Sequence, residues 1–71
     1  MNPIIEAVMG HIHDGKKVAR LHPDSPSHTK KVTIFFEDGT SDDVPIECDH
    51  QTFLDWWGQS GAYLRDKGII Q

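Results

Sequence analysis

The strongest constraint on the fold lies between Lys30 and Glu47, where an alternating apolar stretch runs into a turn and is followed by a second one. The apolar positions are two residues apart on both sides of the turn: Val32, Ile34 and Phe36 before it, and Val44 and Ile46 after it. A period of two with β-branched and aromatic residues is typical of strands that bury one face. The pattern predicts a β-hairpin.

The length of the turn decides whether the two apolar sets share a face. A two-residue loop would put Val44 opposite Thr33, on the wrong side of the hairpin. A three-residue loop, Glu37-Asp38-Gly39, puts Val44 opposite Val32 and Phe36 opposite Thr40, so that all five apolar side chains face one way. Burial should select this register, and the glycine suits the positive φ that such a loop requires at its end. We therefore predict the three-residue turn.

The same hairpin carries the acidic excess of the chain, which has 11 acidic and 7 basic residues and a net charge of −4. No Lys or Arg occurs between its acidic residues, which are Glu37, Asp38, Asp42, Asp43, Glu47 and Asp49. One interpretation is a solvated edge strand whose charges prevent edge-to-edge aggregation. The other is an acidic surface that docks on a basic partner, where charge steers association more than it sets affinity.

The segment before the hairpin predicts a helix, a strand and a loop. Asn2-Pro3 is typical of a helix start, and apolar residues at roughly helical spacing predict a helix from Pro3 to about His11. Lys16 to His22 could form a first strand, although Val18 and Ala19 interrupt its alternation. His22 to Thr29 is rich in proline and serine and predicts a loop.

The segment after the hairpin predicts a helix that begins at Asp49 and ends at Gly68. Its expected inner face is Phe53, Leu54, Trp57, Gly61 and Leu64, with Trp56, Ser60 and Tyr63 as a neighbouring stripe. Gly58 and Gly61 each disfavour a helix interior by about 1 kcal/mol. We favour a break or kink near Gly58; the alternative is that the glycines allow a close approach to the sheet.

These elements predict a single α+β domain over residues 1–71. An N-terminal helix precedes a three-stranded antiparallel meander, and a C-terminal helical segment packs on one face of the sheet. A chain this short buries a small core, so a homodimer is plausible. Cys48 is the only cysteine, and neither a signal peptide nor a membrane span is expected. A cytoplasmic protein is the default expectation.

No constellation of residues predicts a reaction or a cofactor. His11-x-His13 and Cys48-x-His50 could supply four zinc ligands, but neither pair has the spacing of a zinc finger. We favour solvated histidines and no metal. Cys48 lies between two acidic residues, which disfavours the thiolate that a nucleophile needs. The expectation is a protein without enzymatic activity.

His22-Pro23-Asp24 is the tripeptide that marks J-domain co-chaperones. In that family it joins two long helices, whereas here a strand pattern follows within a few residues. We interpret it as a proline turn.

The leading functional hypothesis is a protein-binding module, in size and acidity similar to small phage-encoded inhibitors of host enzymes or defence systems. The acidic hairpin would meet a basic partner surface, with Trp56 or Tyr63 as an apolar anchor. The alternative is a small-ligand or nucleotide-binding protein that uses a basic cluster at a dimer seam, formed by Lys16, Lys17, Arg20, Lys30 and Lys31. Direct nucleic-acid binding is a minor possibility at a pI of about 5.6. A third hypothesis is a purely structural subunit.

Overall fold

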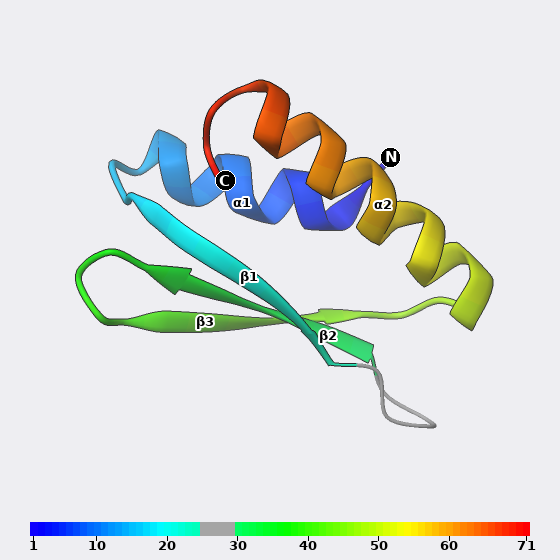
Figure 1. Cartoon of the computed structure of the whole chain (residues 1–71). Helices are drawn as coiled ribbons and strands as arrows, with labels where there is room; N and C mark the ends of the chain where they lie inside the picture. Colours follow the sequence, from blue (N-terminus) through cyan, green and yellow to red (C-terminus); the bar gives the residue numbers. More distant parts are fainter. Residues whose placement is uncertain (25–29) are drawn as a thin grey trace.

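A computed structural model describes residues 1–24 and 30–71. The elements in chain order are α1 (Pro3–His13), β1 (Val18–Asp24), β2 (Lys30–Phe36), β3 (Ser41–Ile46) and α2 (His50–Asp66). The three strands form an antiparallel sheet in the order β1-β2-β3. Both helices lie on the same face of this sheet, and in the described part of the chain the other face is uncovered (Figure 1). The predicted α+β fold is confirmed.

The hairpin has the predicted register. Val32 lies opposite Val44, and the Phe36 N–H donates to the Thr40 carbonyl at 2.9 Å, which closes a three-residue turn. Gly39 has φ +90°, a conformation that other residues rarely adopt. Four of the five predicted apolar side chains are buried and the fifth, Val44, is half-buried. The buried face selected the register, as expected.

The first strand is confirmed but lies two residues later than predicted. A β-bulge between Val18 and Arg20 accommodates Ala19 as an extra residue, which explains the interrupted alternation. The predicted proline turn at residues 22–24 is wrong, because these residues continue β1 and Pro23 lies opposite Val32. Proline is tolerated there since β1 is an edge strand. The rest of the predicted loop, residues 25–29, lies outside the described residues.

The C-terminal helix is unbroken, so the predicted break near Gly58 is wrong. A Cβ added at Gly58 would meet no atom within 4 Å, and the helix is held instead by its buried residues Phe53, Ser60 and Leu64. Leu54, predicted to face inward, is 46% exposed. The helix ends at Asp66, and Gly68, the predicted stop, follows the C-cap Lys67 with φ +74°.

The N-terminal helix continues to His13, about two residues beyond the predicted end. Gly10 lies within it, and an added Cβ there would meet no atom within 4 Å. Ile4 and Val8 face the sheet and are buried. Because Ile4 packs with Val32 and Val8 packs with Ile34, α1 covers the central strand along its length.

The two helices are joined through the side chain of Asn2, which caps α1. Its Oδ1 accepts from the Ile4 and Ile5 N–H groups at 3.0 and 3.2 Å, and its Nδ2 donates to the Trp56 carbonyl at 3.0 Å. The fully buried Ser60 hydroxyl donates to the same carbonyl at 2.7 Å. One N-cap residue therefore also satisfies polar groups inside the helix–helix contact.

Candidate functional site

The five predicted acidic residues all lie on or beside β3, which forms one edge of the sheet. Glu37 and Asp38 are in the turn before this strand, Asp42 and Asp43 are within it, and Glu47 follows its last residue. We call these five residues the acidic row. The strand has six residues, so the row extends over about 20 Å.

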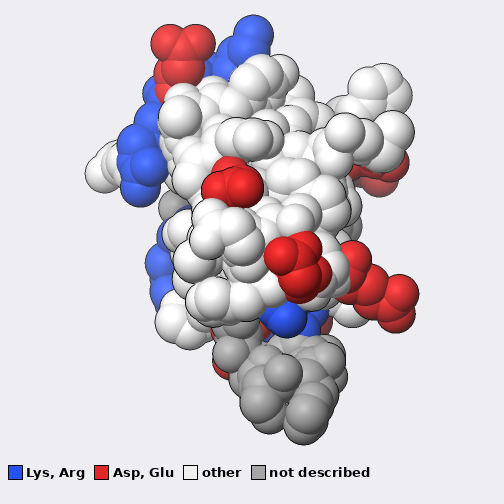
Figure 2. Space-filling view, turned by 90° about the vertical axis from the view of Figure 1, so that its right-hand side faces the viewer, with Lys and Arg blue, Asp and Glu red and all other residues white. Residues whose placement is uncertain are grey.

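The acidic row does not form a flat patch on one face. Asp42 lies opposite Ile34 and therefore points toward the helix side of the sheet, whereas Asp43 lies opposite Thr33 and points toward the uncovered side. Because neighbouring residues of β3 point to opposite faces, the acidic row is a rim along an edge strand. Figure 2 views the end of the molecule away from the hairpin turn, where Lys and Arg side chains lie mostly along the left margin and Asp and Glu side chains mostly over the middle and right.

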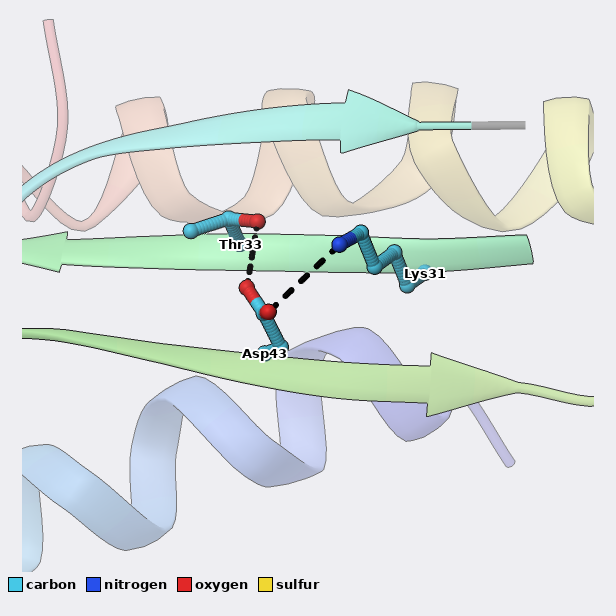
Figure 3. Close-up of polar contacts among 3 residues, drawn as sticks. All are labelled: Lys31, Thr33 and Asp43. Carbon is cyan, nitrogen blue, oxygen red and sulfur yellow. Dashed lines mark hydrogen bonds and ion pairs between the residues drawn. The ribbon is translucent and has the colours of Figure 1, made fainter. Parts of the chain in front are cut away.

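Asp43 has two polar partners on the neighbouring strand (Figure 3). The Thr33 hydroxyl donates to Asp43 Oδ1 at 2.7 Å, and Lys31 Nζ lies 3.4 Å from Oδ2. The hydrogen bond from Thr33, with a smaller contribution from the Lys31 charge, lowers the pKa of Asp43 below its ordinary value. This carboxylate is ionised and held in one orientation on the uncovered face of the sheet.

Asp38 is fixed by the turn itself. Its Oδ1 accepts from both the hydroxyl and the backbone N–H of Thr40. These hydrogen bonds lower the pKa of Asp38, and the nearby charge of Lys16 contributes less. The tip of the hairpin therefore presents a charged group in a defined position.

Asp42 contacts the last turn of α1. Its Oδ2 lies 2.8 Å from His11 Nε2, and the His11 ring packs edge-on against Phe36 with ring centroids 4.9 Å apart. The Asp42 side chain is 46% exposed and that of His11 is 25% exposed. Asp42 thus links the edge strand to the helix layer and still reaches solvent.

The two predicted aromatic anchors have different environments on α2. Trp56 is half-buried against the core cluster that contains Phe53. Tyr63 is 38% exposed, and Lys67 Nζ lies 5.5 Å from its ring centroid. In the described part of the chain no hydrogen bond or ion pair joins either residue to the acidic row. Tyr63 is the more accessible of the two.

The predicted basic cluster is divided among several contacts. Arg20 stacks over the Phe35 ring at 4.0 Å, Lys16 lies over the Phe36 ring at 4.6 Å, and Lys31 pairs with Asp43. The first and third contacts are on the uncovered face, because Phe35 and Lys31 alternate with the buried residues of β2. These side chains do not converge on one point.

Sequence reasoning missed a groove at the opposite edge of the sheet. It lies between β1 and α2 and has a volume of about 620 Å³. Its strand wall is Val18 to Leu21, and its helix wall includes Trp57, Gly58, Gly61 and Arg65. The segment after α2, including Ile69 and Ile70, completes it. The two glycines of α2 were the available signal, because Gly58 leaves open space and Gly61 leaves room for the Arg65 guanidinium, and neither breaks the helix.

No metal centre is found within residues 1–24 and 30–71, where no group of three or more His, Cys, Asp or Glu side chains could hold an ion. His11 and Asp42 form a pair, whereas Cys48 is a free, half-buried thiol at the other end of β3. None of the described helices is both long enough and apolar enough to cross a membrane.

Comparison with known proteins adds no family assignment. No family model, curated protein or solved structure matches this chain.

Proposed function

We propose that this chain is a non-enzymatic protein-binding module that meets a basic partner surface with the acidic row. The observation that carries the proposal is the placement of the carboxylates along an exposed edge strand, with Asp38 and Asp43 oriented by hydrogen bonds from threonine side chains that also lower the pKa of both carboxyl groups. Fixed charges lose little freedom when a partner binds, so they favour recognition. Their summed field also accelerates association with a basic surface.

The chemistry of the partner follows from this surface. It should present Lys or Arg side chains along a line of about 20 Å, to match the length of the edge strand. A nucleic-acid-binding protein fits this description, because its phosphate-binding groove has the required charge. The acidic row would then act as an inhibitor by occupying that groove. Exposed Tyr63 is available as an additional apolar anchor.

Two further properties belong to the same proposal. The single free thiol of Cys48 suits a reducing compartment such as the cytoplasm. A homodimer stays a prediction, and its test is the molar mass in solution over a range of concentrations.

The proposal is tested by removing charge while keeping the hydrogen bonds. The variant Asp38→Asn/Asp42→Asn/Asp43→Asn retains an acceptor oxygen at each position. The matched control, Glu6→Gln/Asp55→Asn/Asp66→Asn, removes the same charge from the helices. Each protein is immobilised, and bound proteins from a lysate of the source organism are identified by mass spectrometry and measured at low and high salt.

We expect a partner with a basic surface that the control retains and the edge variant binds about tenfold more weakly, since exposed charge pairs contribute about 0.2–1 kcal/mol each. Binding should also weaken as salt is raised. Equal retention by the edge variant and the control, or binding that does not change with salt, would show that the acidic row is not the contact surface.

A further inference from the structure

We propose that the groove between β1 and α2 binds an extended peptide segment of a partner protein, which adds to the open edge of β1 as a short fourth strand. The segment has apolar side chains and one carboxylate. This site lies at the edge of the sheet opposite to β3, and Glu37 is the member of the acidic row that reaches it.

The backbone of β1 offers hydrogen-bonding groups at this edge. Along an antiparallel ladder, residues point their backbone groups alternately at one neighbouring strand and at the other. The Phe36 N–H donates to the Thr40 carbonyl, so the even-numbered residues of β2 point at β3 and the odd-numbered ones at β1. Leu21 and Pro23 lie opposite even-numbered residues. Both therefore point their backbone groups away from β2, toward the open edge.

Only part of this edge can accept a strand. Leu21 has both an N–H and a carbonyl to offer, whereas Pro23 has no N–H, so it interrupts further pairing. On the other side of Leu21, the bulge at Val18 and Arg20 disturbs the ladder. The accessible stretch is therefore short, and it coincides with the four strand residues that line the groove, Val18 to Leu21.

The walls of the groove suit apolar side chains. Trp57, Ile69 and Ile70 are half-buried and line it, so each still exposes apolar surface to an occupant. Gly58 and Gly61 lie on the same wall and contribute no side chain. At Gly58 an added Cβ would enter open space. A strand added at an edge places alternate side chains in the pockets beside it, and here the helix wall leaves room for them.

A single arginine on the helix wall can bind the carboxylate. Arg65 lines the groove together with one acidic residue, Glu37, whereas Arg20 borders the groove but stacks its guanidinium on Phe35 on the uncovered face. Arg65 is held in place, because its Nε donates to the Gln71 carbonyl at 3.2 Å and its guanidinium occupies the space that a side chain at Gly61 would fill. An oriented guanidinium with outer N–H groups is a preferred partner of a carboxylate.

A second copy and a nucleotide fit the same observations less well. If two copies paired through their β1 strands, Pro23 of each copy would offer no N–H to the opposing strand. One carbonyl of the other copy would then have no donor. A nucleotide needs converging donors for its phosphates, but of the two arginines that line the groove only Arg65 is on its side of the sheet, because Arg20 stacks on Phe35 at 4.0 Å on the uncovered face. A short peptide needs the outward N–H and carbonyl of Leu21 and the apolar wall, which the groove has.

Short linear peptides are first selected from a displayed random library for binding to the full chain. Binding of the enriched peptide to three variants is then measured. Gly58→Leu adds a side chain to the groove at a position where an added Cβ meets no atom within 4 Å. Gly10→Leu is the matched control, since it is also a helical glycine with no atom within 4 Å of an added Cβ. Arg65→Gln removes the charge. Hydrogen exchange of the Leu21 amide is followed by NMR with and without peptide, and ATP is tested in the same assay.

We expect the selected peptides to be enriched in apolar residues around one Asp or Glu. The Leu21 amide should exchange more slowly when peptide is bound. Peptide affinity should be about tenfold or more weaker in Gly58→Leu and unchanged in Gly10→Leu. Selection on Arg65→Gln should lose the acidic preference. The proposal is overturned if Gly58→Leu binds as well as wild type or if the Leu21 amide is unaffected. ATP binding without peptide enrichment, or a dimer that Gly58→Leu abolishes, would also overturn it and assign the groove to another occupant.

Discussion

The two edges of the sheet, β1 and β3, differ in their chemistry. Both carry a proline near the end of the strand, Pro23 in β1 and Pro45 in β3, and both prolines lack the N–H that a further strand would need. At β3 the rest of the edge is acidic and bordered by solvent. At β1 the rest of the edge lies next to α2 and is lined by Trp57 and two arginines.

This difference shows that protecting a sheet edge from aggregation and using it to bind a partner are separate properties. Charge and proline on β3 discourage pairing with another sheet, yet the same carboxylates can attract a basic surface. On β1 the proline limits pairing to a short stretch, so the edge can accept a peptide segment without templating aggregation. The following experiments test how differently the two edges are built.

The largest expected change in the free energy of unfolding concerns the inward-facing side chains of the two edge strands. Ile46 of β3 is only 3% exposed, so Ile46→Ala should lower the free energy of unfolding by about 2–5 kcal/mol. Leu21 of β1 is half-buried beside the groove, and Leu21→Ala should cost roughly half as much because less surface returns to water. Urea unfolding followed by tryptophan fluorescence measures both.

The control for this pair is Leu54→Ala, since Leu54 is largely exposed and should change stability by no more than about 0.5 kcal/mol. If Leu21→Ala were as costly as Ile46→Ala, β1 would be as firmly packed as β3, and the groove would be an integral part of the core instead of an accessible site.

A smaller change in stability is expected at the turn between β2 and β3, which sets the register of β3. Gly39 has φ +90°, so Gly39→Ala should destabilise the chain by about 1–2 kcal/mol. The matched control is Gly10→Ala, which should stabilise it by up to about 1 kcal/mol because Gly10 is helical and has free space around it. Thermal unfolding distinguishes the two, and a shift of the same sign in both would contradict the assigned turn.

Much of the fold was predictable because neighbouring residues determine it. The hairpin register follows from five apolar positions and one glycine, and the helix ends follow from Asn2 and Gly68. The errors came from tertiary context. Gly58 was expected to break α2, but burial of the side chains around it outweighs its low helix propensity. Pro23 was assigned to a turn, although an edge strand tolerates it.

The candidate site was predictable only in part. The sequence locates the acidic residues in one segment, but it cannot show that Asp42 pairs with His11 on α1, because their separation of 31 residues is closed only by the fold. The groove was not predictable at all. It arises where the C-terminal half of α2 passes over β1, and no local pattern specifies which helix covers which strand.

The smallest expected effect is the pH dependence of the acidic row. The pKa values of Asp38 and Asp43 are lowered in the folded chain, chiefly by hydrogen bonds from Thr40 and Thr33. Their contribution to stability is therefore complete above the unfolded pKa of about 3.9 and is lost as the pH falls through the lower folded values. Stability should fall between about pH 5 and about pH 3, and less so in Asp38→Asn/Asp43→Asn. Thr33→Val should raise the pKa of Asp43 measured by NMR titration; an unchanged value would mean that the fixed orientation of this carboxylate does not come from the neighbouring strand.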